Sequence, residues 1–111
     1  MALLLAACSK HDDFDFTGDV VDYEECGMGY SSFGYAISLS APDSLGGDYI
    51  TRGNKHYTNV IVVYGADRQL RENDKVSGKM YLDPNYSKTT CDYHYTRNCP
   101  EGVFTKLEVI K

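Results

Sequence analysis

Several features that commonly mark functional sites are missing from this chain of 111 residues. Its four cysteines form no Cys-x-x-Cys pair, so neither a redox motif nor a zinc ribbon is supported. No serine lies in a nucleophile elbow, and no cysteine has an evident histidine partner. No apolar run is long enough to span a membrane as a helix. The net charge of −5 argues against a general nucleic-acid surface, which would be basic.

The residues that are abundant favour β-strands. The chain has ten tyrosines and four phenylalanines but no tryptophan, and valine, isoleucine and threonine are frequent. Residues 8–50 carry one lysine against nine acidic residues, a net charge of −8. Residues 51–111 carry ten basic against seven acidic residues, a net charge of +3. We interpret this asymmetry as an acidic solvated edge beside a mildly basic one, in preference to a docking surface.

An apolar segment leads directly into a cysteine near the N-terminus. Leu5-Ala6-Ala7-Cys8 follows two further leucines and is followed at once by the polar residues 9–13. It resembles the lipobox of bacterial lipoproteins, in which the cysteine sulfur receives a diacylglycerol and the new amine a third acyl chain. Two or three such chains anchor a protein stably. The resemblance implies that residues 1–7 are the remnant of a signal peptide, that residues 8–15 form a lipidated tether, and that Cys8 carries the lipid.

The lipobox also implies a location in the cell envelope, anchored to the outer membrane on its periplasmic or surface side. Lys10 followed by Asp12 and Asp13 resembles the surface-export signal of lipoproteins in some Gram-negative gut bacteria. The alternative is a cytosolic protein whose apolar N-terminal run packs on its own core. Residues 16–111 then make one small domain, of a size at which a hydrophobic core alone is marginal.

Alternating apolar and polar residues predict five strands and one short edge strand. In the first strand, Val21 and Tyr23 are expected on one face and Val20 and Asp22 on the other. The unbroken β-branched run within residues 59–64 predicts a strand that is covered on both faces. The predicted strands are Phe16–Glu25, Tyr30–Ser40, Asn59–Tyr64, Lys75–Leu82 and Val103–Lys111, with the edge strand at Tyr49–Thr51.

The same alternation assigns a buried face to the later strands. It leaves Ala36 on an exposed face, and it predicts that Gly78 allows a bend at a barrel corner. Gly65–Asp74 is the one plausible helical segment, one to two turns long, and Leu70 is expected to close an end of the barrel. The residues expected inside are Tyr35, Ile37, Leu39, Val76, Gly78, Met80, Leu82, Val103, Leu107 and Val109.

Five strands with at most one short helix between the third and the fourth predict an all-β fold, a small five-stranded OB-fold-like barrel. The arrangement is similar to the small OB-fold lipoproteins of unknown function from Gram-negative gut bacteria. That resemblance depends on Thr17-Gly18-Asp19-Val20-Val21, on Asp74-Lys75-Val76-Ser77-Gly78 and on the lipobox. Because the second connection is long, a sandwich or a more open barrel is the alternative.

Lipidation of Cys8 leaves three candidate cysteines for a disulfide, Cys26, Cys91 and Cys99. An exported protein favours one disulfide and one remaining thiol among them. A bond between Cys91 and Cys99 closes a short loop. A bond from Cys26 to either of them joins distant segments and stabilises more in the chain-entropy model. The sequence alone does not choose between these pairings.

The segment Asp83–Pro100 is long, polar and aromatic, which is typical of a functional loop. Tyrosine offers a flat apolar face with a polar tip, which suits sugars, peptides or protein partners. The alternative is that these tyrosines pack the loop onto the barrel. Asp92 and His94 are too few ligands for a closed zinc site, and we expect no metal and no cofactor. The candidate binding residues are Tyr86, Lys88, Tyr93, His94, Tyr95 and Arg97.

The sequence therefore predicts a lipid-anchored, non-catalytic domain of the cell envelope that binds a protein or a glycan. No catalytic residue is assigned. The alternative from another class is a small envelope enzyme or inhibitor that uses the loop 83–100. A third hypothesis, single-stranded nucleic-acid binding, requires a basic groove with stacking aromatic residues. The acidic net charge argues against it.

Overall fold

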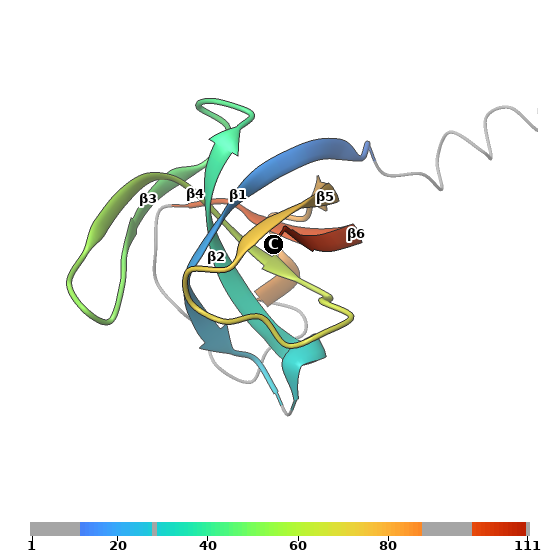
Figure 1. Ribbon diagram of the computed structural model, residues 1–111, viewed down its shortest axis with the longest axis horizontal. Helices are drawn as coiled ribbons and strands as arrows, with labels where there is room; N and C mark the ends of the chain where they lie inside the picture. Colours follow the sequence, from blue (N-terminus) through green and yellow to red (C-terminus); the bar gives the residue numbers. More distant parts are fainter. Residues whose placement is uncertain (1–11, 28, 88–98, 111) are drawn as a thin grey trace, which may run out of the picture.

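The computed structural model describes residues 12–27, 29–87 and 99–110, which form six β-strands and one turn of 3-10 helix (Figure 1). Among these residues no helix is long and apolar enough to cross a membrane. The elements are β1 (Phe14–Glu25), η1 (Tyr30–Ser32), β2 (Phe33–Ala41), β3 (Gly47–Ile50), β4 (His56–Tyr64), β5 (Lys75–Leu82) and β6 (Glu101–Ile110).

Five of the strands close into a ring of hydrogen bonds. β1 pairs with β2 and with β5, β2 pairs with β4, and β6 joins β5 to β4. The pairing of β4 with β6 is parallel, and the other four pairings in the ring are antiparallel. A ring closed in this way removes the open edges that a flat sheet of the same strands would expose. The predicted all-β, five-stranded OB-fold-like barrel is confirmed.

The sixth strand, β3, forms an arm outside the ring. β3 pairs with the first half of β4, from Gly47 opposite Val60 to Ile50 opposite His56. The two strands extend away from the barrel as a hairpin, which lies on the left in Figure 1. The predicted edge strand at Tyr49–Thr51 therefore exists, and it begins two residues earlier than expected. We refer to β3 and residues 51–59 as the arm.

The inside of the barrel is filled by side chains from all five ring strands. Tyr35, Ile37, Val76 and Met80 are fully buried there, as the alternation of β2 and β5 predicts. Leu82 is an exception, because it lies at the last position of β5 and is 41% exposed. The inner core consists of Phe16, Val20, Tyr35, Ile37, Leu39, Ile61, Val63, Ala66, Leu70, Val76, Met80, Phe104 and Leu107.

Two bulges correct the predicted faces of the first and last strands. Val20 lies opposite Ile37 and Asp22 opposite Ala36, so Val21 is an extra residue in β1. Val20 therefore packs in the inner core together with Tyr23, and Val21 packs on the outside of the barrel, so the predicted pairing of Val21 with Tyr23 is wrong. A strand cannot keep strict alternation across an inserted residue, because the insertion reverses every later side chain.

The second bulge lies in β6. Lys106 is opposite Lys79 and Phe104 is opposite Met80, which leaves Thr105 as the extra residue. The inner core therefore takes Phe104 and Leu107 from this strand. Val103, which was predicted to be buried, is only partly covered, and Val109 packs at the margin of the core.

The segment Gly65–Asp74 contains no helix, contrary to the expectation of one or two helical turns. Gly65 and Asn73 both adopt positive φ, at 82° and 75°, which breaks the run at each end. Leu70 nevertheless enters the inner core, and its N–H donates to the hydroxyl of Tyr35 at 3.3 Å. The segment therefore closes one end of the barrel as predicted, with an irregular backbone in place of a helix.

The close approach of β5 and β6 at Gly78 can be tested by adding a single methyl group. Gly78 has a φ of 149°, and a Cβ added there would lie 2.0 Å from the carbonyl oxygen of Lys106. Backbone strain and overpacking each cost roughly 1–3 kcal/mol. We predict that Gly78→Ala lowers the free energy of unfolding by about 3 kcal/mol in chemical denaturation.

Gly53 provides the matched control for this substitution. The nearest atom to an added Cβ is the Thr51 hydroxyl oxygen at 3.8 Å, an ordinary contact. Gly53→Ala should therefore change the free energy of unfolding by less than about 0.5 kcal/mol. Equal stability of the two variants would show that Gly78 is not under steric constraint.

Candidate functional site

The outer surface of β2 and β4 is where OB-type barrels commonly bind their ligands, and here the chain itself covers it. Val60, Val62 and Tyr64 point outward from β4 and are nevertheless fully buried. Tyr86 stacks on Tyr64 with ring centroids 4.4 Å apart and an interplanar angle of 21°. We call the group on this surface the outer cluster; its buried members are Cys26, Ala36, Tyr49, Val60, Val62, Tyr64 and Cys99.

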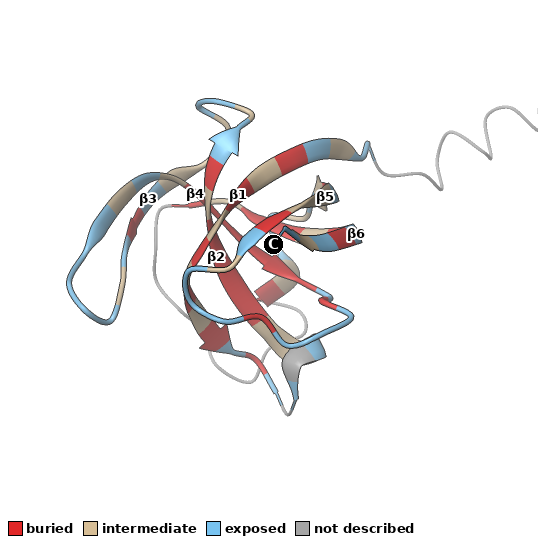
Figure 2. Cartoon of the chain, in the orientation of Figure 1, coloured by how far each residue is buried: buried red, intermediate tan, exposed pale blue. Residues whose placement is uncertain are grey.

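The outer cluster explains why β4 is covered on both faces. Ile61 and Val63 fill the barrel, while Val60 and Val62 lie in the outer cluster, so the prediction for this strand is confirmed. The prediction for Ala36 is wrong, because the outer cluster buries this residue, although Ser40 on the same predicted face is exposed. Figure 2 shows buried residues along the central strands and exposed residues along the loop of the arm.

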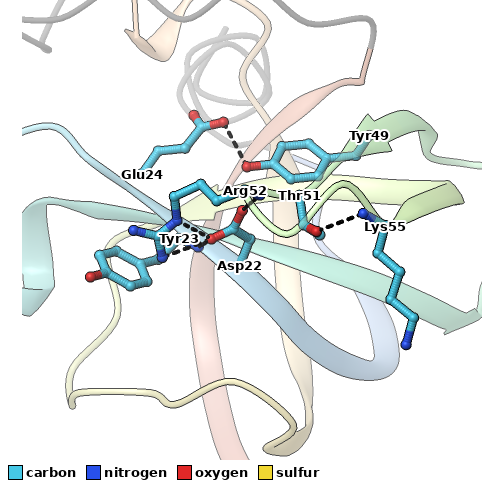
Figure 3. A network of polar contacts seen from close by, with 7 residues as sticks. All are labelled: Asp22, Tyr23, Glu24, Tyr49, Thr51, Arg52 and Lys55. Carbon is cyan, nitrogen blue, oxygen red and sulfur yellow. Dashed lines mark hydrogen bonds and ion pairs between the residues drawn. The ribbon is translucent and has the colours of Figure 1, made fainter.

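A buried carboxylate fastens the arm to the barrel. Asp22 Oδ1 accepts hydrogen bonds from Arg52 Nε and from the backbone N–H of Tyr23, at 2.9 and 2.8 Å, and Asp22 Oδ2 accepts from the backbone N–H of Arg52 at 2.9 Å (Figure 3). Arg52 Nη2 lies 2.9 Å from Asp22 Oδ1. The guanidinium also covers the ring of Tyr23, with Cζ 4.2 Å from the ring centroid. We call these contacts the arm clamp.

A second carboxylate from the same face of β1 extends this connection. The buried Glu24 accepts a hydrogen bond from the Tyr49 hydroxyl at 3.0 Å (Figure 3). Asp22 and Glu24 face the arm because the bulge at Val21 turns them outward. The sequence analysis did not identify this pair, since the alternation read without a bulge places Asp22 beside Val20. The arm clamp joins β1 to the turn that follows β3, and it holds the arm against the barrel.

The predicted binding loop is described only at its two ends. Tyr86 packs on Tyr64, and the backbone N–H and hydroxyl of Ser87 donate to the buried carboxylate of Glu101, at 2.9 and 2.5 Å. The start of the loop is therefore fixed to β6. The other candidate residues, Lys88, Tyr93, His94, Tyr95 and Arg97, lie outside the described residues.

The cysteines of the outer cluster differ in state. Cys26 takes part in a disulfide, whereas Cys99 is a buried thiol. The pairing of Cys26 with Cys99, one of those that the sequence left open, is therefore not formed. Cys8 and Cys91 lie outside the described residues.

An open cleft of about 630 Å³ lies at the end of the barrel where β1 begins and β5 ends. It is lined by Asp12 and Phe14 at the start of β1, by the loop 42–45 between β2 and β3, and by Tyr81 and Leu82 at the end of β5. Three segments that are distant in the sequence thus meet here. A concave, mostly apolar site of this volume is of the size that binds small ligands or side chains.

The base of the arm holds the loop of the cleft in place. Asn59 Oδ1 accepts a hydrogen bond from the Gly46 N–H at 2.6 Å, and Asn59 Nδ2 donates to the carbonyl oxygens of Leu39 and Pro42, at 3.3 and 3.1 Å. A Cβ at Gly46 would meet the backbone N of Val60 at 2.4 Å, so only glycine allows this close approach. The loop 42–45 is therefore positioned by β4 and not by its own contacts alone.

The cleft is electrostatically negative. Asp12 and Asp43 contribute carboxylates to its lining, and its described lining contains no lysine, arginine or histidine. Burial raises the pKa of the Tyr81 hydroxyl, and the carboxylates of Asp83 and Asp13 raise it further. The carboxylates of the lining would attract a cation that enters the cleft.

The described residues contain no group of three or more side chains arranged to hold a metal ion. His56 Nε2 lies 3.8 Å from Asp48 Oδ1 on the arm, and both side chains are exposed. His11, Asp92 and His94 lie outside the described residues.

Comparisons of the chain with protein-family models, with curated proteins and with solved structures give no match. The class defined by the fold is that of small closed all-β barrels.

The arm clamp leads to a stability prediction. An exposed ion pair contributes little, and the Arg52 side chain is 63% exposed, but the Asp22 side chain is only 3% exposed. Removing the guanidinium leaves a buried charge with fewer partners, which costs about 2 kcal/mol. We predict this loss for Arg52→Ala in chemical denaturation, together with faster amide hydrogen exchange in β3.

Lys75→Ala is the matched control. Lys75 pairs with Asp19 at 3.2 Å, and both of these side chains are exposed. Its removal should cost less than about 0.5 kcal/mol and leave exchange in β3 unchanged. If the two variants lose the same stability, the arm clamp contributes no more than a surface ion pair.

The cysteine states lead to a chemical prediction. We expect one intramolecular disulfide that includes Cys26, so reduction should add two hydrogens to the intact mass. The same gain is expected for Cys99→Ser and no gain for Cys26→Ser. A thiol reagent should modify Cys99 only after unfolding, because this side chain is buried. Loss of the mass change in Cys99→Ser would contradict the assignment.

Proposed function

We propose that this chain is a lipid-anchored, non-catalytic β-barrel domain of the bacterial cell envelope that binds a protein or glycan partner. The binding part of the proposal is supported by the cleft at the start of β1, which is open, mostly apolar and held by the base of the arm. The anchoring part is supported by Leu5-Ala6-Ala7-Cys8, which resembles a lipobox.

The short segment between Cys8 and β1 keeps the cleft close to the proposed lipid anchor. Five residues, 9–13, separate Cys8 from the first residue of β1. An extended chain covers at most about 3.5 Å per residue, so Phe14 stays within about 20 Å of a lipidated sulfur. Phe14 also lines the cleft. In the proposed protein, the end of the barrel that carries the cleft therefore lies nearest to the membrane.

The outer cluster weakens the hypothesis of single-stranded nucleic-acid binding. Such binding uses aromatic rings that are free to stack on bases along a basic groove. Tyr64, which occupies the usual ligand surface, is fully buried and stacks on Tyr86. The cleft has acidic residues in place of basic ones. The alternative of an enzyme or inhibitor depends on loop residues that lie outside the described part of the chain.

The anchor is tested by replacing its cysteine. We predict that the native protein partitions into the detergent phase of a detergent–water separation and that Cys8→Ala moves it to the aqueous phase. The reason is that each buried methylene of an acyl chain contributes about 0.8 kcal/mol to membrane binding.

Cys99→Ala is the control, because Cys99 is buried in the outer cluster. This variant should remain in the detergent phase. Detergent partitioning of the Cys8→Ala chain, or aqueous partitioning of the native protein, would remove the anchor from the proposal.

A further inference from the structure

We infer that the cleft binds a short polypeptide segment in which a lysine or arginine side chain stands next to apolar side chains. This inference rests on the proposed function, because it names the class of partner for the same site. The chemistry of the cleft walls, its charge and its rigidity each support it.

The walls of the cleft select for apolar groups. Phe14, Leu45 and Leu82 line it from three different segments. Leu82 is 41% exposed although Val76 and Met80 of the same strand are buried, so it offers apolar surface that the fold itself does not use. Covering such surface is favourable in proportion to the area removed from water. A glycan, which carries a hydroxyl on most carbons, matches these walls poorly.

The charge of the cleft selects for a cation. Asp12 and Asp43 line the cleft from two different segments, one before β1 and one in the loop between β2 and β3, and both are exposed to solvent. No described lining residue carries a compensating positive charge. A lysine or arginine side chain combines an apolar stem with a charged head, so one such residue can contact the apolar walls through its stem and a carboxylate of the lining through its head.

The cleft is also held in its open shape before any partner arrives. The loop 42–45 is fixed to Asn59 by the Pro42 carbonyl, and Phe14 is held opposite Met80 in the pairing of β1 with β5. A preformed site binds without a large ordering cost. Because the cleft is open rather than enclosed, an extended segment can pass through it with its ends in solvent.

The probe for the test is a fluorescein-labelled hexapeptide in which lysine and leucine alternate. Two matched peptides replace lysine with glutamate or leucine with serine. Binding to the full chain carrying Cys8→Ala is measured in solution by fluorescence anisotropy, so that the lipid anchor plays no part. We expect the lysine–leucine peptide to bind at least about 5-fold more tightly than either matched peptide.

Four variants locate the site. Asp12→Asn with Asp43→Asn should weaken binding about 5-fold or more. Asp48→Asn with Asp67→Asn removes the same charge from carboxylates that are 65% and 66% exposed and lie outside the cleft, and should change binding by less than about 2-fold. Leu82→Ser should weaken binding. Ile110→Ser should not, because Ile110 lies outside the cleft on β6, with a side chain of the same size that is 48% exposed.

Each outcome decides the inference. Selective loss in the cleft variants, with amide shifts of residues 43–45 in nuclear magnetic resonance, supports it. Equal weakening by both aspartate pairs would show attraction by net charge alone and overturn it. Absence of peptide binding, or tighter binding of phospholipid vesicles or oligosaccharides at these residues, also overturns it. None of these results depends on whether the native protein partitions into detergent. The peptide experiment therefore tests the cleft, and the partitioning experiment tests the lipid anchor, independently of each other.

Discussion

The burial of β4 on both faces is the constraint on which the rest of the structure depends. Ile61 and Val63 complete the barrel, while Val60 and Val62 require a second layer outside it. The arm, Tyr86 and the two described cysteines supply that layer. Because one strand belongs to two hydrophobic clusters, the arm is part of the domain and not an appendage. The surface that an OB-type barrel commonly offers to ligands is used here for folding, and the open surface lies at the end of the barrel.

Much of the fold was predictable because the strands have strong local signals. The β-branched run of β4 and the alternation of β2 and β5 predicted the central strands and most of the inner core. The bulges at Val21 and Thr105 were not predictable, because an inserted residue changes the register without changing the local composition. The segment Gly65–Asp74 was expected to be helical, yet one to two turns are too short to form a helix without support, and the N–H of Leu70 donates to Tyr35 instead.

The cleft was much harder to predict from the sequence than the fold. Asp12 was assigned to the predicted tether 8–15, although β1 begins at Phe14, and Asp43 was not among the candidate site residues. Their shared site exists only because ring closure brings the start of β1 to the end of β5 and Asn59 draws the loop 42–45 toward β4. The one available signal was Phe14, an aromatic residue between aspartates that a tether does not need. The polar and aromatic composition of the loop 83–100 predicted a binding loop, but its described end at Tyr86 packs on the barrel.

The inserted residue at Val21 determines which chemical groups β1 can present on each side. Before it, the strand directs Phe16 and Val20 inward; after it, Asp22 and Glu24 point away from the barrel toward the arm. A chain shorter by this single position would rotate both carboxylates into an apolar interior, where ionised groups are not tolerated. Deletion of one residue here is therefore not tolerated, whereas many substitutions of Val21 are. Proteins with the same fold and the same buried carboxylates should conserve the length of β1 more strictly than its residues.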